Sequence, residues 1–465
     1  MSIASITASS RLAGIVGPAH VISESPELSA YEIGGHRPQA VVRPGSGEEV
    51  AQIVKFAFSE KLAMVPCGAR TKLSMGLPPR QYDLALDLTR LDRVTAYDPG
   101  DLTLAVEPGM RLHALEKVLG EHKQWVPLAV PYFTQATAGG AIASGVDTPL
   151  RQMYGTARDY VLGLEFVTGE GVAAKSGGRV VKNVSGYDMH KLMIGALGTL
   201  GVITKINLRT FPVSVATSVF VANFDSAARA IELRHRLARS PLRPMSLEIL
   251  SPSAGQLLAS DAAARIVPEA VPADVLPENR WTLVAEFSGI EEVLARCERD
   301  FRQMASECSA THIQVIAREA AYSIVSRIRE FIPVALASSP STTILKLSVL
   351  PTRVTQLLAI AEQAAELNSL PFAAMARGLG VIYVALSPGD RGEEARRRVI
   401  QATDHILNEC AKLEGNATIP WSPAEWKPAL KVWGLPRADF DQMRKLKTVF
   451  DPGSVLAPGR FMGGL

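Results

Sequence analysis

The stretch that decides the fold reads Arg179-Val-Val-Lys-Asn-Val-Ser-Gly-Tyr-Asp188 and continues beyond Leu192 as Gly195-Ala-Leu-Gly-Thr-Leu-Gly-Val-Ile203. Its glycines fall where a strand, a helix and a second strand are expected to meet: Gly186, Gly195, Gly198 and Gly201. Because glycine has no side chain, a flat ligand can approach the backbone closely there. We interpret the stretch as half of a ligand site. The other half lies upstream, at residues 65–73 and 136–140.

The composition is that of an ordinary globular protein. The chain has 465 residues, of which 47% are hydrophobic, so it can form two or three domains. Lys plus Arg number 49 and Asp plus Glu 46, and no dense basic patch is interleaved with aromatics, so we expect no nucleic-acid partner. The longest nearly apolar segment, 192–204, is shorter than the roughly 20 residues that cross a bilayer. We therefore expect no transmembrane segment, and the N-terminus shows no signal-peptide pattern.

The four cysteines form no CxxC pair, which argues against a disulfide framework or a cysteine-rich metal site. We expect a reducing, cytoplasmic environment.

The first part of the chain predicts a βαβ unit. Strands are expected near residues 40–43 and 61–66, and Ser46-Gly-Glu-Glu49 is typical of a capping box before the helix between them. The second strand leads into a glycine-containing loop at Gly68. Ligands often bind at this end of a strand.

The pattern changes after Pro212. Two rounds of strand, helix, strand, strand, helix between residues 215 and 413 predict an antiparallel sheet backed by helices. Segment 251–278 is rich in Ala, Pro and Asp, and we interpret it as a surface excursion. The expected fold class is α+β. The expected parts are an N-terminal arm (1–34), a ligand-binding domain (35–213), a cap domain (214–435) and a tail that packs back on the ligand-binding domain (436–465).

Singly, each glycine loop is a weak signal. Residues 68–73 could form a backbone nest for a pyrophosphate, with charge from Arg70 and Lys72, but a plain surface turn is the alternative. The spacing is not that of a Walker motif. Gly198-Thr-Leu-Gly201 lacks the GxGxxG spacing, which disfavours NAD.

Together the loops carry a resemblance. Residues 35–213 resemble the FAD-binding domain of the vanillyl-alcohol oxidase/p-cresol methylhydroxylase (PCMH-type) superfamily, most strongly in Val-Val-Lys-Asn-Val-Ser-Gly-Tyr-Asp, in Gly-Thr-Leu-Gly-Val-Ile and in the tail Phe-Asp-Pro…Pro-Gly-Arg. Within it, the chain is similar to the E-subunit family of bacterial glycolate oxidases (glycolate dehydrogenases). The matching stretches are Val432-Trp-Gly434, Leu446-Lys447 and Gly459-Arg-Phe-Met-Gly-Gly464. The resemblance is weakest in the cap.

The resemblance implies a two-lobed FAD-binding domain below a cap with an antiparallel sheet. It also implies the residues that contact FAD: Pro66, Gly68, Ala69, Arg70, Thr71, Lys72, Leu73, Thr137, Ala138, Gly139, Gly140, Ser144, Gly145, Tyr154, Gly155, Arg158, Asp159, Lys182, Gly198, Gly201, Val202, Ile203 and Arg460. Small residues and a helix N-terminus suit a diphosphate.

Two departures from the superfamily matter. Covalent flavin attachment there uses a His or Cys, but the first loop has no His and Cys67 is expected to be a buried strand cysteine, so we expect non-covalent FAD. The related catalytic subunits carry His-Ala-Gly-Asp-Gly-Asn-x-His, whose histidines bind a metal. The matching stretch here has Ala376 and Tyr383 at the histidine positions and Val381 at the Asn position, so we expect no metal site.

The candidates for catalysis each have a plainer alternative. Arg329 could pair with a substrate carboxylate, or be a solvated helix residue beside Glu330. Lys182 could place a cation near the reduced flavin, or make a phosphate or surface contact. We interpret His190 as a helix-surface histidine.

The resemblance implies an FAD-binding subunit of a glycolate oxidase-like complex, in which glycolate is oxidised to glyoxylate. The implied partners are a catalytic flavoprotein subunit and an iron–sulfur subunit that takes the electrons, and these could hold the chain at a membrane. Three alternatives remain open: a self-sufficient FAD-dependent 2-hydroxy acid dehydrogenase, a non-catalytic relay or assembly subunit, and a flavin fold without FAD. The full set of loop glycines speaks against the last.

Overall fold

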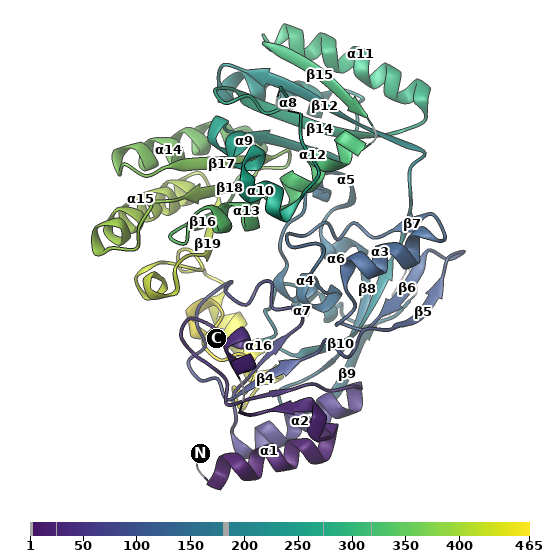
Figure 1. Ribbon diagram of the computed structural model, residues 1–465, viewed down its shortest axis with the longest axis vertical. Coiled ribbons are helices and arrows are strands. Elements are labelled where there is room, and N and C mark those ends of the chain that lie inside the picture. The colour runs from purple at the N-terminus through teal and green to yellow at the C-terminus, as the bar shows by residue number, and fades with distance from the viewer. Residues whose placement is uncertain (1–2, 25, 180–185, 273, 318) are drawn as a thin grey trace. The chain divides into compact units, whose positions relative to one another are not determined.

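The computed structural model describes residues 3–24, 26–179, 186–272, 274–317 and 319–465 (Figure 1). Its contacts divide the chain into two compact units. The first unit comprises Met1–Val146, Thr156–Val213 and Pro436–Leu465, and the second comprises Asp147–Gly155 and Ser214–Leu435. Residues 180–185, which include Lys182 and much of the stretch quoted first, lie outside the described residues.

The first sheet of the first unit contains the predicted βαβ unit. Its strand order is β1 (Val21–Ile22), β2 (Ala40–Val42), β4 (Leu84–Asp87) and β3 (Met64–Cys67), with β2 and β3 both parallel to β4. Helix α2 (Gly47–Glu60) connects β2 to β3. Ser46 caps it by accepting from the Glu49 amide over 3.1 Å, and the Glu49 carboxylate accepts from the Gly45 amide over 2.7 Å. The Gly68 loop therefore begins at the C-terminal end of β3, as predicted.

The second sheet of this unit is antiparallel. Its strand order is β5 (Val94–Asp98), β6 (Thr103–Val106), β10 (Val202–Arg209), β8 (Val161–Val167) and β9 (Ala173–Gly177). Helices α3 (Leu112–Gly120) and α4 (Ala138–Ser144) share its buried apolar core. The smaller elements of this unit are α1 (Ile3–Val16), α6 (Ala157–Tyr160), α7 (His190–Met193), β7 (Gln124–Trp125) and β11 (Phe211–Pro212), whereas α5 (Arg151–Tyr154) belongs to the second unit. Short 3₁₀ turns cover Pro18–His20 and Pro26–Tyr31.

The tail packs into the first unit. Within α16 (Phe440–Phe450), the buried Lys447 ammonium donates to the carbonyl oxygens of Thr199 and Leu456 over 2.8 and 2.9 Å, and to Asp451 over 2.5 Å. Arg460 donates to the carbonyls of Leu73 and Met75, each over 2.6 Å. Lys447 thus connects the tail to the residues before β10, and Arg460 connects it to the loop after β3.

The second unit is built on one antiparallel eight-stranded sheet. The strand order is β15 (His312–Ala317), β12 (Ala216–Phe224), β14 (Trp281–Gly289), β13 (Ser246–Leu250), β17 (Phe372–Arg377), β18 (Val381–Leu386), β16 (Thr343–Ser348) and β19 (Asn416–Trp421). The strands of the two predicted rounds form the two halves of the sheet, which meet through β13 and β17, and β19 is an additional strand that was not predicted. The helices that pack on the sheet include α8 (Ala227–Arg239), α11 (Glu291–Glu307), α14 (Val354–Leu367) and α15 (Glu393–Lys412). The predicted α+β class with an antiparallel sheet and helices is confirmed.

The expected surface excursion at residues 251–278 is wrong. This segment forms α9 (Pro252–Ala259) and α10 (Asp261–Ile266), each capped by a serine whose hydroxyl accepts from a backbone amide. Ala254, Leu258 and Ala263 are fully buried. Alanine has a high helix propensity, and each serine stabilises a helix N-terminus as its cap. These two effects favour helices more than the Pro and Asp content, on which the prediction relied, disfavours them. The remaining helices of this unit are α12 (Glu319–Arg329) and α13 (Phe331–Ser338), with 3₁₀ turns at Pro351–Arg353 and Ala424–Ala429.

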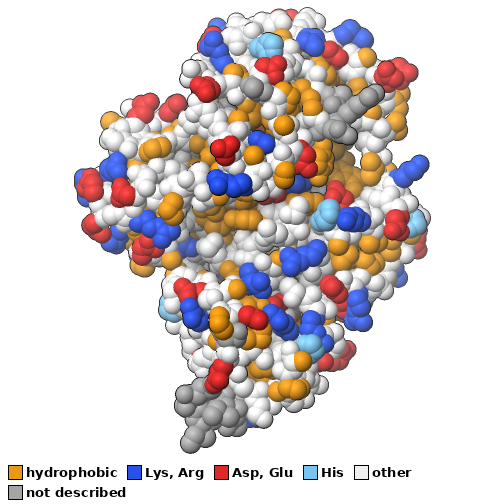
Figure 2. Space-filling model, viewed as in Figure 1, with side chains coloured by type: hydrophobic (Ala, Val, Ile, Leu, Met, Phe, Trp, Pro, Cys, Tyr) orange, Lys and Arg blue, Asp and Glu red, His pale blue; other side chains and the backbone are white. Residues whose placement is uncertain are grey.

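The surface and the helices fit the expectations from composition. Basic and acidic side chains are interspersed over the face drawn in Figure 2, in keeping with a net charge of +3. Within the described ranges, no helix has both the length and the apolar character that a membrane crossing needs.

Candidate functional site

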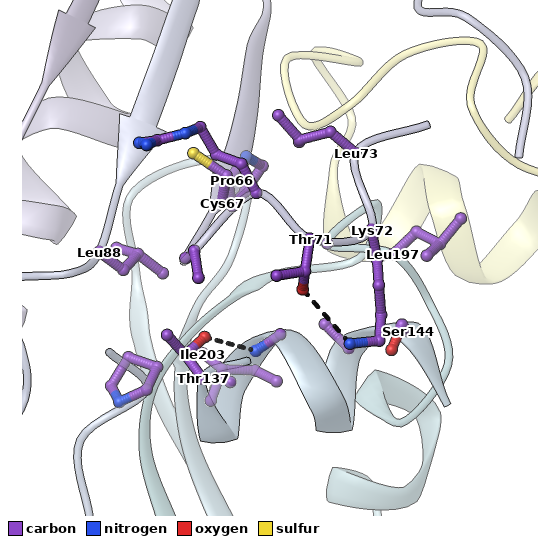
Figure 3. A pocket seen from close by; sticks show the side chains of 18 of the residues that line it. Pro66, Cys67, Thr71, Lys72, Leu73, Leu88, Thr137, Ser144, Leu197 and Ile203 are labelled. Carbon is purple, nitrogen blue, oxygen red and sulfur yellow. Dashed lines mark hydrogen bonds between the residues drawn. The ribbon is translucent and has the colours of Figure 1, made fainter. Parts of the chain in front are cut away.

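The glycine loops of the first unit line one pocket (Figure 3). Three distant segments meet there: the loop after β3, the start of α4 and the residues leading into β10, with Arg460 of the tail beside them. The predicted site residues that line it are Pro66, Gly68, Ala69, Arg70, Thr71, Lys72, Leu73, Thr137, Gly139, Gly140, Ser144, Gly198, Gly201, Ile203 and Arg460.

Close packing explains why glycines are needed here. Thr137 caps α4, with its Oγ1 accepting from the Gly140 amide over 3.3 Å. A Cβ on Gly68 would overlap this same oxygen, and one on Gly139 would overlap Pro108. Gly198 has a φ of 74°, a left-handed conformation that costs glycine little. The loops thus approach one another more closely than side chains would permit.

The cations of the first loop already have protein partners. The Arg70 guanidinium lies 4.5 Å over the Tyr31 ring and 3.6 Å from the Asp87 carboxylate. Asp87 also accepts from the Tyr31 hydroxyl over 2.5 Å, and burial, followed by this bond, raises the pKa of Tyr31 to about 12. Lys72 donates to the Pro131 carbonyl over 3.1 Å. Arg70 and Lys72, which were expected to supply charge to a ligand, therefore hold the backbone of this loop in place. Arg70 itself has a φ of 63°.

Several predicted site residues do not line the pocket. Ala138, Gly145 and Val202 lie in or next to α4 and β10 without lining it. Arg158 donates to the Ile194 carbonyl over 3.5 Å, and Asp159 accepts from the Thr156 amide over 2.7 Å. Tyr154 and Gly155 belong to the second unit. The placement of Lys182 is outside the described residues.

The pocket also contains residues that were not predicted to contact FAD: Cys67, Leu88, Pro108, Ala143 and Leu197. Cys67 lies in β3 and is buried, as predicted, and burial raises the pKa of its thiol. The other four are apolar. Apolar residues next to a glycine loop resemble ordinary core residues, so the sequence offered no signal for them.

Two interpretations of single residues need correction. His190 is 3% exposed rather than on the helix surface, and its backbone amide donates to the Ser176 hydroxyl over 3.1 Å. Arg329 ends α12 with only 11% of its side chain exposed, so it is no solvated residue, and its guanidinium donates to Glu330 over 3.2 Å. Arg329 is buried because it pairs with Glu330, a carboxylate that is itself buried and needs a compensating charge.

A second group of polar residues lies within the second unit. Glu248 on β13 stands directly opposite Arg377 on β17, and Tyr383 on β18 stands directly opposite Lys346 on β16. Met375, which is two residues from Arg377, pairs with Tyr383. Because directly paired residues share a face of an antiparallel sheet, as do residues two apart on a strand, these side chains form one row across four neighbouring strands. We call it the polar row.

The polar row is charged and buried. The Arg377 guanidinium donates to Glu248 over 2.9 Å and lies 3.1 Å from Asp147, which also pairs with Arg151 over 3.2 Å. Burial raises the pKa of Glu248 to about 7, against the opposing charge of Arg377. Burial likewise lowers the pKa of Lys346.

The stretch matched to the metal-binding motif borders this row. Ala376 and Tyr383 are both buried in the sheet. In the part of the chain that the structure describes, no three His, Cys, Asp or Glu side chains gather as metal ligands would. Ala376 instead precedes Arg377 in β17, and Tyr383 stands opposite Lys346.

Comparisons with known proteins match both units. Residues 38–177 match the FAD binding domain family, and residues 214–419 match the C-terminal domain of FAD linked oxidases. Glycolate oxidase subunit GlcD of Bacillus subtilis (strain 168) is 25% identical over 425 residues, which is 91% of this chain and 88% of that protein. Glycolate oxidase subunit GlcE of Escherichia coli (strain K12) is 36% identical over 160 residues, 34% of this chain and 45% of that protein.

The fold has solved counterparts. A crystal structure of p-cresol methylhydroxylase with substrate bound aligns with a TM-score of 0.76, covering 99% of this chain and 97% of that one at 18% identity. At this identity the likeness establishes the fold.

Proposed function

We propose that this chain, an FAD-dependent oxidoreductase with an FAD-binding domain and the C-terminal domain of FAD-linked oxidases, is the FAD-binding subunit of a glycolate oxidase-like complex and has no metal-assisted hydroxy acid site of its own. The reaction is glycolate to glyoxylate. The observation that carries the proposal is the glycine-lined pocket of the first unit, in a chain that aligns over 91% of its length with GlcD.

The pocket residues fit FAD. Gly68 and Gly139 leave a cradle that a Cβ on either would close, and the loop after β3 faces the capped start of α4. Backbone amides in such a loop suit a diphosphate. In this proposal residues 68–72 bind the pyrophosphate, and Thr137, Gly139, Gly140 and Ser144 bind beside it. FAD supplies the two-electron acceptor, while Arg460 orients the loop through the Leu73 and Met75 carbonyls.

Partners and attachment follow from the same proposal. The electrons pass to an iron–sulfur subunit, and a catalytic flavoprotein subunit completes the complex. The chain works in the cytoplasm and reaches a membrane through these partners. FAD is held non-covalently, since no histidine is among the residues that the described structure places around the pocket and Cys67 is a buried thiol.

A second candidate is a self-sufficient FAD-dependent 2-hydroxy acid dehydrogenase. The polar row favours it, because Lys346, Arg377 and Tyr383 bring cations and a hydroxyl together within the second unit. Such groups can recognise a carboxylate without a metal.

Anaerobic reduction of the flavin distinguishes the complex subunit from the self-sufficient dehydrogenase. The chain, purified alone with FAD, is mixed with glycolate and separately with D-lactate, and the visible flavin spectrum is followed; the experiment is repeated with the partner subunits. Bleaching by the chain alone supports the self-sufficient enzyme, and bleaching only with partners supports the subunit. An unreduced flavin in every mixture contradicts hydroxy acid oxidation by this protein.

A further inference from the structure

Lys346 is the cation of the polar row that has no partner. Its side chain is half-buried, and among the residues that the structure describes it makes neither a hydrogen bond nor an ion pair. Removing an ammonium group from water without a partner is costly, so positions of this kind are uncommon in proteins. The charge therefore needs either a structural reason or a ligand.

The neighbouring charges leave Lys346 in excess. Arg377 is matched by Glu248 and Asp147, and Asp147 is shared with Arg151. Three cations thus face two carboxylates, and Lys346, which is attracted by Asp147 without pairing with it, is the cation that has no hydrogen bond or ion pair among the described residues. One additional negative charge would balance the group.

The Tyr383 hydroxyl gives independent support. Tyr383 is 1% exposed, and although the Asp147 backbone amide approaches its oxygen, the described residues offer no acceptor for its O–H. Its ring lies 5.4 Å from the Arg377 guanidinium, which holds it in place. Burial raises its pKa, so the phenol stays protonated and can donate. A buried donor without an acceptor is rare in native structures.

We propose that Lys346 and the Tyr383 hydroxyl bind the carboxylate of the hydroxy acid, the ammonium supplying the charge and the phenol a hydrogen bond. This rests on the proposed function for the identity of the anion. The two residues stand opposite each other on adjacent strands, so their side chains share a face of the sheet. The row therefore supplies, with protein cations, the anion recognition that histidines and a metal would otherwise supply.

Oxalate is the probe, because it is a small carboxylate with no hydroxyl to oxidise. Its binding to the FAD-loaded full chain is measured by calorimetry. Lys346→Met removes the charge while keeping the length, and we expect it to raise the oxalate Kd about 10- to 100-fold, the range for a hydrogen bond to a charged group. Lys346→Arg should keep binding within a few-fold. Lys412→Met, an exposed lysine of the same unit paired with Glu409, is the matched control and should change nothing.

Tyr383→Phe provides a second variant that does not depend on the lysine, and we expect a rise in Kd of about 10- to 100-fold, because the lost hydrogen bond is one to a charged carboxylate. Wild-type binding that Lys346→Met leaves unchanged would overturn the proposal, and so would a wild-type chain that binds no oxalate. Failure here is distinct from failure of the proposed function. Glycolate that bleaches the flavin equally in wild type and Lys346→Met overturns the anion site alone. Lysine-dependent oxalate binding without any flavin reduction keeps the site and overturns the oxidation.

Discussion

Arg377 and Glu248 face each other across two neighbouring strands, and the guanidinium donates to the carboxylate over 2.9 Å. Their side chains are 5% and 1% exposed. Removing one member of such a buried pair leaves the other charge without compensation, which costs far more than an exposed ion pair contributes.

Arg377→Met is expected to lower the free energy of unfolding by about 3–5 kcal/mol, because Glu248 and Asp147 lose their shared cation. Urea unfolding measures this. Arg397→Met is the control: Arg397 pairs with Glu394 on the exposed side of α15, and its loss should leave the free energy of unfolding nearly unchanged. Equal losses of unfolding free energy in the two variants would contradict the prediction that the buried pair matters more than the exposed pair.

Glu248 should make stability depend on pH. Its pKa is about 7 in the folded protein, against an ordinary value of 4.5. The folded state therefore keeps a proton that the unfolded chain releases, so this contribution is complete below pH 4.5 and is lost as the pH rises to 7. The stability of wild type relative to Glu248→Gln should fall by about 3 kcal/mol over that window. Unfolding curves at several pH values give the difference, and a constant difference would contradict the shifted pKa.

Gly68→Ala should weaken FAD binding, by about 5- to 30-fold if the misplaced cap costs the 1–2 kcal/mol of a lost N-cap. The new Cβ overlaps Thr137 Oγ1, which must rotate and release the Gly140 amide. Fluorescence titration with FAD measures the loss. Gly120→Ala is the matched control, since a Cβ there meets nothing within 4 Å. Unchanged FAD affinity in Gly68→Ala would place the cofactor elsewhere.

Acid precipitation should release all the flavin into the supernatant. The Cys67 thiol is buried in β3 with a raised pKa, so it is a poor nucleophile toward a flavin. Cys67→Ala should accordingly keep its FAD. Flavin that stays with the precipitated protein in wild type and is released in Cys67→Ala would establish covalent attachment.

The elements that the sequence predicted well have strong local signals. The capping box at Ser46 and the apolar spacing after it define α2, and repeated strand and helix patterns define the sheet of the second unit. The glycine loops were predicted to belong together only through the family resemblance. Glycines in a sequence indicate tight turns and close backbone contacts, but they do not indicate which loops contact each other.

What the sequence missed depends on tertiary contacts. His190 is buried against Ser176 of β9, and Arg329 is buried beside the Glu330 carboxylate, which is itself buried. The polar row needs the register of four strands, and a shift of one residue would turn Lys346 to the other face. No pattern in a single strand contains that information.

The central claim is that the glycine-lined pocket of the first unit holds FAD for hydroxy acid oxidation. Its most direct test is the visible spectrum of the purified full chain, recorded with its partner subunits before and after anaerobic glycolate. The account predicts a flavin spectrum that glycolate bleaches, and that needs a higher FAD concentration to appear in the Gly68→Ala chain. A chain that carries no flavin and takes up none when FAD is added would contradict it.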